Sequence, residues 1–319
     1  MGMHMVIALA AAIAVTAAAP AAPPPPGNGA CDRACLEGVL DQYLKALPTH
    51  DPSRAPLARE VIFTENGQRL SLPDGLWNTA DGLRPYRLAF VDPPAGEVGA
   101  FAVVGESGET AILAIRLKVL NRRITEVETQ VARPGGALYA ADQLTEPKPI
   151  WARPLKRSER SSTADMIRIA DSYFEGLEQE TDKLTPWDKD CVRVENGVQV
   201  TSNPARNTER SKLGGMTCQQ QFATGFSKFI TQVRERRYLV VDEERGLVYA
   251  VVFFDHAGNV PQVKLADGSV MQVAPAYRKP RTWMIAELFK IRSGRIAQIQ
   301  AVLVDVPYHM ESGWTDHRR

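Results

Sequence analysis

Two stretches of the chain have the spacing of hydrophobic residues that is typical of an amphipathic helix. Apolar side chains recur every three or four residues in each of them. They are Leu36, Val39, Leu40, Tyr43, Leu44 and Leu47 in the first stretch, and Ile167, Ala170, Tyr173, Phe174 and Leu177 in the second. Each stretch therefore predicts a helix that buries one face.

Segments with strand character follow these helices. Residues 247–256, 281–291 and 295–306 are rich in β-branched and aromatic residues, and Ser293 and Gly294 form a turn between the last two. The order predicts an α+β protein in which helices pack in a curved antiparallel sheet. A sheet that wraps its helices as a cone leaves room for a pocket.

The chain also matches itself when it is shifted by 130 residues. DQYLKAL at 41–47 aligns with DSYFEGL at 171–177, and TENG at 64–67 aligns with VENG at 194–197. Seven of the 27 aligned positions are identical, whereas chance at roughly 6% per position would give between one and two. A duplication explains this match, and each copy is then one structural unit.

The second copy is longer, mainly around residues 216–230 and 258–283. Such insertions usually decorate one rim of a scaffold, where ligands are held. In both copies an Asn-Gly pair stands between strand-like segments, which predicts a type I′ hairpin turn. The expected organisation is a signal peptide (1–19), a Pro/Gly-rich spacer (20–30), a first module (31–152), a linker (153–163) and a second module (164–319).

The leader and the cysteines indicate export. Residues 5–19 form an uncharged apolar run that is too short to span a bilayer as a helix, and small residues follow it. We therefore expect a periplasmic or secreted protein without membrane contact after removal of the leader. Four cysteines suit an oxidising compartment, and sequence neighbourhood favours Cys31–Cys35 and Cys191–Cys218 among three connectivities.

Composition and motifs limit the function. The 319 residues suit two domains, and a formal charge of +1 with 24% charged residues does not favour nucleic-acid binding. Nucleotide-binding, zinc-protease and serine-hydrolase motifs are missing from the sequence. Any catalysis is therefore expected to use protein acids and bases, without a metal ion or another cofactor.

Three residues of the second copy are candidate catalytic groups. His256 ends an apolar strand, where an imidazole suits proton transfer, although a surface turn is the alternative. Glu287 interrupts an apolar run, so it has either a raised pKa or an arginine partner, Arg281 or Arg292. Tyr173 lies on the apolar face of the predicted helix, and it either belongs to the core or has the role that the family resemblance described below implies.

Four further residues are candidate substrate-binding groups: Trp283, Tyr308, His309 and Arg281. Tyr308 and His309 follow the last strand, and this tail either crosses the mouth of the pocket or clamps onto the sheet. Aromatic side chains there would stack on a flat ligand.

Three segments also carry a family resemblance. A helix, an ENG-containing strand and then AELFKIRSGRIAQIQAV resemble the nuclear-transport-factor-2-like superfamily, which includes SnoaL cyclases, ketosteroid isomerases and scytalone dehydratases. TENGQRLSLPDGLW, RLKV and EVETQVAR are similar to exported tandem-module proteins of unassigned function from fungi and bacteria. The resemblance implies a cone with a pocket, a first-helix tyrosine that donates to an oxyanion, and pairing through the open sheet face.

The same superfamily includes lyases that remove formaldehyde from lignin-derived diaryl compounds. We therefore hypothesise a cofactor-independent lyase, dehydratase or isomerase that acts on a small hydroxylated, possibly aromatic compound. The alternative is a non-catalytic module that binds a small molecule or a protein. The two modules are expected to pair with each other or with a second copy of the chain.

Overall fold

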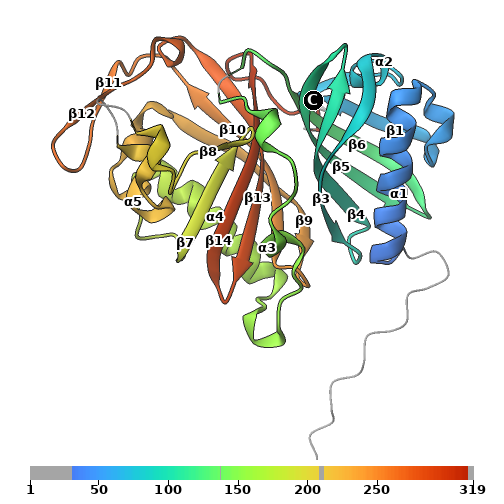
Figure 1. The fold of residues 1–319 in the computed structure, drawn as a ribbon, viewed down its shortest axis with the longest axis horizontal. Coiled ribbons are helices and arrows are strands. Elements are labelled where there is room, and N and C mark those ends of the chain that lie inside the picture. The colour runs from blue at the N-terminus through green and yellow to red at the C-terminus, as the bar shows by residue number, and fades with distance from the viewer. Residues whose placement is uncertain (1–30, 137, 208–211, 315–319) are drawn as a thin grey trace, which may run out of the picture.

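The computed structural model describes residues 31–136, 138–207 and 212–314, and consists of two curved β-sheets with their helices (Figure 1). The predicted signal peptide and spacer lie outside the described residues. No helix in the described part of the chain is long and apolar enough to cross a membrane.

The first module has helix α1 and a six-stranded sheet with the order β2-β1-β6-β5-β4-β3. Its elements are α1 (Arg33–Ala46), β1 (Leu57–Glu65), β2 (Gln68–Leu70), α2 (Leu76–Thr79), β3 (Ala80–Asp92), β4 (Glu97–Glu106), β5 (Glu109–Leu120) and β6 (Arg123–Ala132). A short helix α3 (Pro149–Ala152) lies between the modules.

The second module has the same strand order, β8-β7-β14-β13-β10-β9. Its elements are α4 (Thr163–Glu178), β7 (Trp187–Glu195), β8 (Val198–Gln199), α5 (Cys218–Ala223), β9 (Gln232–Asp242), β10 (Leu247–His256), β11 (Gln262–Lys264), β12 (Val270–Gln272), β13 (Arg281–Arg292) and β14 (Arg295–Val306). Helix α5 and the small β11–β12 hairpin lie in the two predicted insertions.

The α+β class with two similar modules is confirmed, but the sheets are mixed rather than antiparallel. β1 pairs parallel with β6, and β7 pairs parallel with β14. The antiparallel expectation rested on the hairpins of the later strands, which do pair that way. In each module the first strand after the long helix pairs with the last strand of the sheet. No local sequence pattern specifies such a long-range pairing.

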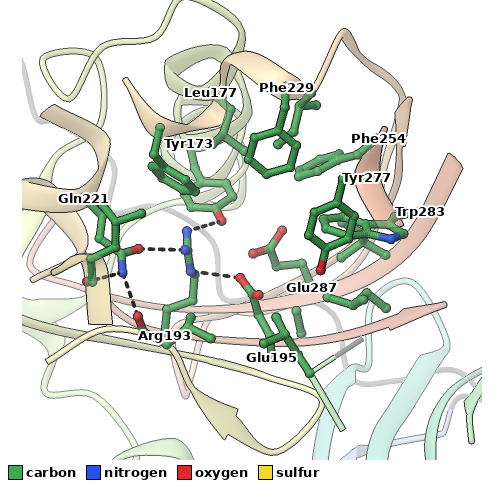
Figure 2. A pocket seen from close by; sticks show the side chains of 18 of the residues that line it. Tyr173, Leu177, Arg193, Glu195, Gln221, Phe229, Phe254, Tyr277, Trp283 and Glu287 are labelled. Atoms are coloured by element: carbon green, nitrogen blue, oxygen red, sulfur yellow. Dashed lines mark hydrogen bonds and ion pairs between the residues drawn. The ribbon is translucent and has the colours of Figure 1, made fainter. Parts of the chain in front are cut away.

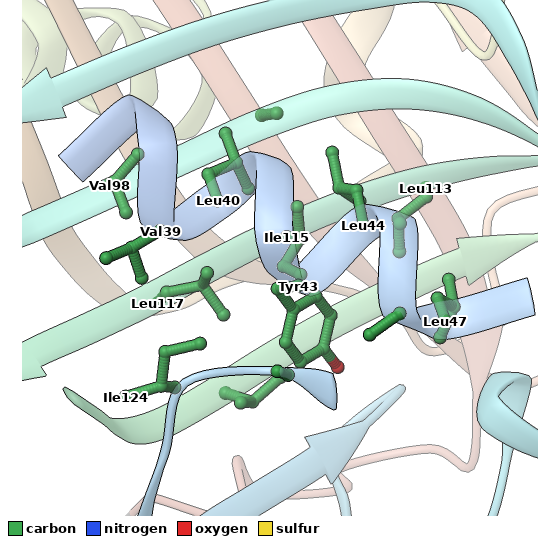
Figure 3. Close-up of a cluster of buried hydrophobic side chains, with 14 of the residues drawn as sticks. Val39, Leu40, Tyr43, Leu44, Leu47, Val98, Leu113, Ile115, Leu117 and Ile124 are labelled. Carbon is green, nitrogen blue, oxygen red and sulfur yellow. The ribbon is translucent and has the colours of Figure 1, made fainter. Parts of the chain in front are cut away.

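Helix α1 forms because its apolar residues share one face and its first turn is capped. The Asp32 side chain accepts a hydrogen bond from the Cys35 amide at 2.9 Å, a cap worth about 1 kcal/mol. Leu40 and Leu44 are buried against the concave face of the sheet, as Figure 3 shows. Each such leucine contributes about 1.5–3 kcal/mol of hydrophobic stabilisation.

The two Asn-Gly turns are confirmed, with positive φ at both residues of each pair. Asn66 lies beyond the end of β1 and bonds the backbone of Val131 through both side-chain amide atoms. Asn196 does the same with Leu303. The repeated asparagine therefore lengthens the parallel strand pair of each module.

The outer faces of the two sheets pack against each other in the centre of the molecule (Figure 1). β3 contacts β9, and β6 contacts β14. Phe90 stacks on Tyr249 with ring centroids 4.8 Å apart, and Arg237 donates to the buried carboxylate of Glu128 at 3.2 Å. This shared core makes one body of the two modules.

Each module also supports the Asn-Gly turn of the other. The backbone of Ala140, which follows β6, bonds the carbonyl of Asn196 at 2.9 Å. Met310, which follows β14, lies so close to Gly67 that a β-carbon there would stand 2.5 Å from its Cε. The positive φ favours a glycine at this position, whereas the tip of the flexible Met310 side chain could move to make room for a β-carbon.

The predicted disulfides are confirmed, with Cys31 bonded to Cys35 and Cys191 bonded to Cys218. The first closes a single turn at the start of α1. The second joins β7 to α5 and so attaches the first insertion to the sheet.

Candidate functional site

A cavity of about 250 Å³ opens in the second module between α4, the concave face of the sheet and the first insertion (Figure 2). Most of its wall is apolar. The hydrophobic side chains are Leu138, Leu177, Val200, Leu213, Phe226, Phe229, Ile230, Phe254, Tyr277, Trp283, Ile285, Ala301 and Leu303. Four polar groups, Tyr173, Arg193, Gln221 and Glu287, are buried among them.

Arg193 is at the centre of the polar group. It points inward from β7 and donates to the hydroxyl of Tyr173 at 3.2 Å and to Oε1 of Gln221 at 2.8 Å. Its Nε lies 3.0 Å from Oε1 of Glu195, an ion pair. These acceptors and the negative charge of Glu195 hold the guanidinium in one orientation and compensate its charge.

Gln221 fixes this arrangement from the insertion. Its amide nitrogen donates to the carbonyls of Val200 and Leu213, both at 2.7 Å, which turns its oxygen toward Arg193. Helix α5, which carries Gln221, begins at Cys218 and is therefore bonded to β7 by the disulfide. The insertion thus supplies one wall and one polar contact of the cavity.

Glu287 points into the cavity from the middle of β13 and is only 2% exposed. Its Oε2 is buried without a hydrogen-bond partner among the described residues. Burial raises the pKa of the Glu287 carboxyl to about 8, against the opposing attraction of Arg193 and the Tyr173 hydroxyl. The group is therefore mostly protonated at neutral pH and close to its titration point.

Tyr173 reaches the cavity from α4. Burial and the nearby Glu287 carboxylate raise the pKa of its phenol well above its usual value, so the hydroxyl stays protonated. Because Arg193 donates to the phenol oxygen, the tyrosine's own proton is directed to the cavity side, where the Glu287 carboxyl and a ligand oxygen are alternative acceptors. Figure 2 shows the hydroxyl and the Glu287 carboxyl turned toward the same space.

The first module is filled where the second is hollow. The alignments put Phe63 at the position of Arg193, and the equivalent strand pairings put Ile115 at the position of Glu287. Tyr43, the counterpart of Tyr173, accepts a hydrogen bond from Trp77 at 2.8 Å, and the two rings pack edge to face. Apolar side chains thus replace the polar group of the second module (Figure 3).

His256 is completely buried but does not line the cavity. Its ring packs on three cavity-lining residues, Phe229, Tyr277 and Trp283. Neither ring nitrogen has a hydrogen-bond partner among the described residues. Burial lowers the pKa of this imidazole to about 4, so the ring is neutral and supports the wall from behind.

The four predicted substrate-binding residues lie around the start of β13, but only one of them lines the cavity. Trp283 lines the cavity, with its indole N–H bonded to Asp305 at 3.0 Å. Arg281 forms an ion pair with Asp305 at 3.1 Å, and Nδ1 of His309 lies 3.3 Å from the Asp255 carboxylate. Arg281, Tyr308 and His309 are not among the residues that line the cavity.

The arginine expected to pair with Glu287 is neither Arg281 nor Arg292. Arg292 bonds Asp188 at 2.8 Å, and the nearby cation is Arg193, which was not predicted to be part of the site. A signal for it exists in the repeat, because Arg193 replaces the apolar Phe63 of the first copy. Gln221 has no counterpart in the first copy, and only the three-dimensional structure reveals its contact.

Among the described residues, no group of histidine, cysteine and carboxylate side chains is arranged to hold a metal ion.

Comparisons with known proteins describe the second module and its fold. Residues 159–303 match the model of a family described as "Domain of unknown function (DUF8021)". No curated protein matches the chain.

Three solved structures are similar at low identity. A de novo designed protein with a curved β-sheet is 17% identical, with 32% of this chain and 88% of that chain covered and a TM-score of 0.27. A cystatin-like protein of unknown function from Methylobium petroleophilum PM1 is 14% identical. The match covers 35% of this chain and 84% of that chain, with a TM-score of 0.28. AclR from Streptomyces galilaeus, a proposed hydroxylase, is 11% identical. The match covers 45% of this chain and 91% of that chain, with a TM-score of 0.29. At these identities and TM-scores the similarity supports no conclusion about activity. The α+β assignment is based on the two sheets and their helices.

Proposed function

We propose that the second module is a cofactor-independent lyase, dehydratase or isomerase that acts on a small hydroxylated compound. The observation that carries the proposal is the buried carboxyl of Glu287, which has an unpartnered oxygen in an apolar, ligand-sized cavity. A pKa of about 8 lets this group accept and return a proton near neutral pH. The resemblance to nuclear-transport-factor-2-like enzymes supports the same chemistry.

In the proposed reaction, the ionised form of Glu287 takes a proton from the carbon next to an oxygen-bearing carbon. Tyr173 donates a hydrogen bond to the oxygen, on which negative charge grows, and Arg193 holds the phenol in place. In an isomerisation, Glu287 returns the proton to another carbon. In a dehydration, a C=C bond forms as the C–O bond breaks, and the leaving hydroxide takes the proton from Glu287 and departs as water.

The cavity volume limits the substrate. An engineered cavity of about 150 Å³ holds benzene, so about 250 Å³ has room for one substituted ring. The aromatic wall of Phe229, Phe254 and Trp283 favours a flat ligand. We therefore propose single-ring hydroxylated aromatics as the preferred substrates. The second ring of a lignin-derived diaryl compound would extend out through the opening of the cavity.

We also propose that the protein acts outside the cytoplasm. The two disulfides suit an oxidising compartment, and the apolar run at residues 5–19 suits a cleaved leader.

Activity is tested by incubating the purified protein with a panel of hydroxylated single-ring aromatics, followed by mass spectrometry and by NMR for isomers. Glu287→Gln is expected to lower turnover by about 10²–10⁴-fold, because it removes the proton acceptor. Tyr173→Phe is expected to lower kcat, and turnover by the wild type should rise with pH toward about 8 as Glu287 ionises.

Two controls accompany these variants. Glu109→Gln changes an exposed carboxylate outside the cavity and should leave turnover unchanged. His256→Phe keeps an aromatic ring against the wall and should retain most of the activity. Undiminished turnover by Glu287→Gln would contradict the assigned site, and binding of the panel without turnover would support the alternative of a non-catalytic binding module.

A further inference from the structure

A second cavity of about 510 Å³ lies between the two modules, beside the first. Its walls come from β3 of the first module, the segment 140–151 that includes α3, and strands β7, β8 and β14 of the second module. Arg206 lines both cavities, so the two are neighbours. The proposed reaction makes no use of this space.

The buried part of the wall carries uncharged polar groups with unused hydrogen-bonding capacity. Gln298 is 9% exposed, and its side-chain amide has no hydrogen bond to a described residue. Gln300 accepts from the hydroxyl of Tyr86 at 2.8 Å through its oxygen, and its NH₂ group is left without a described acceptor. The indole N–H of Trp151, a residue 3% exposed, likewise has no described acceptor.

The first module shows that this arrangement is not a general feature of the sheet. Glu126 and Glu128 occupy the positions of Gln298 and Gln300 there, according to the alignment of β6 with β14. Glu126 lies 2.6 Å from Arg116 in an ion pair, and Glu128 accepts from Arg237. The second copy therefore has open amides where the first has satisfied charges.

We propose that the cavity between the modules binds a neutral saccharide. Sugar hydroxyls donate and accept, which suits the amide of Gln298, the NH₂ of Gln300 and the indole N–H of Trp151. Trp151 and Tyr86 add aromatic surface for the apolar face of a sugar ring.

The same groups discriminate against other ligands. An apolar ligand would leave these amides buried without partners, which is unfavourable. A charged ligand would meet no opposite charge in the buried part of the wall, because Glu146, Lys148 and Arg206 are exposed at the rim. The volume lies within the range of about 300–1,000 Å³ that is usual for small-molecule sites.

The test is isothermal titration calorimetry of the full chain with glucose and cellobiose, with glucuronate as the charged probe. At least one neutral sugar should bind with a Kd of about 1 mM or tighter. Glucuronate should bind at least about tenfold more weakly than glucose. Trp151 fluorescence should change on binding, because its ring borders the cavity.

Gln298→Leu and Gln300→Leu should each weaken sugar binding at least about tenfold. Trp151→Phe, which keeps a ring and removes the N–H, should also weaken it. Gln272→Leu, an exposed glutamine on β12, is the matched control and should bind as the wild type does. If Gln298→Leu does not fold, the nearly isosteric Gln298→Glu takes its place and should likewise weaken binding of the neutral sugar.

Failure of this proposal is distinguishable from failure of the proposed reaction. Glu287→Gln should bind sugar normally, and Gln298→Leu should retain turnover of the aromatic panel. Failure of both glucose and cellobiose to bind with a Kd of about 1 mM or tighter would overturn the saccharide site. So would unchanged affinity in a folded Gln298 variant.

Discussion

At the scale of single residues, the unusual group is the carboxyl of Glu287, whose ionisation is unfavourable in the folded chain. Glu287 is enclosed by apolar side chains, and Arg193, the nearest cation, is already engaged by Glu195, Tyr173 and Gln221. A carboxylate in such surroundings loses more hydration than a single shared cation replaces. The carboxyl therefore stays protonated in the folded chain at neutral pH. Its raised pKa also makes the group a candidate catalyst.

This cost predicts a pH dependence of stability. Below about pH 4.5 Glu287 is protonated in both the folded and the unfolded chain, and between 4.5 and about 8 only the unfolded chain releases the proton. The free energy of unfolding should therefore fall as pH rises through this window, by at most about 1.4 kcal/mol per pH unit. Glu287→Gln cannot ionise and should lack this fall.

The measurement is urea unfolding of the wild type and Glu287→Gln from pH 4 to pH 9. The depressed pKa of His256 costs stability on the acid side, as pH falls from about 6.5 toward 4, and cancels in the difference between the two proteins. The stability advantage of the variant should grow toward pH 8 and then level off. Parallel curves across the window would show that Glu287 has an ordinary pKa in the folded chain.

At the scale of the elements, the first insertion converts a filled module into a hollow one. Helix α5 brings Gln221 to Arg193, and the Cys191–Cys218 disulfide attaches this helix to β7. In the first module, the short helix α2 instead places Trp77 against Tyr43.

The disulfides should therefore differ in importance. Cys191 and Cys218 are 27 residues apart, and Cys31 and Cys35 are four apart. Replacing Cys191 and Cys218 by serine should lower the free energy of unfolding by about 3–4 kcal/mol, because the unfolded chain is then no longer closed into a long loop. It should also weaken ligand binding in the cavity, since Gln221 loses its attachment.

Replacement of Cys31 and Cys35 by serine is the matched control, with a smaller loss of stability and unchanged ligand binding. Equal losses in the two double variants, measured by urea unfolding and calorimetric titration, would contradict this role of the insertion.

The elements were predictable to different degrees. The helices α1 and α4 and the strands β10, β13 and β14 follow from local hydrophobic patterns, and the Asn-Gly turns follow from residue type. The parallel partner of β7 was not predictable, because pairing with β14 depends on residues that are more than 100 positions away. Glu287 could be selected as a polar residue in an apolar run, and Tyr173 could be selected through the family resemblance. His256 also ends an apolar strand but lies outside the cavity.

At the scale of the whole molecule, two modules with the same strand order have one shared core and different interiors. Their outer sheet faces pack together, with Phe90 on Tyr249 at the centre. Leu138, from the segment after β6, lines the cavity of the second module. The first module thus contributes to the wall of this cavity rather than repeating it. The aligned sequences carry a signal for this difference, because Arg193 replaces Phe63, although both copies keep the helix tyrosine.

The proposed chemistry depends most on the protonation state of Glu287, which NMR measures directly. The chain is labelled with ¹³C at the side-chain carboxyl carbon of glutamate, and the signal missing from Glu287→Gln assigns this residue. We expect that signal to titrate near pH 8. Titration near pH 4.5, as for an exposed glutamate, would contradict the proposed site.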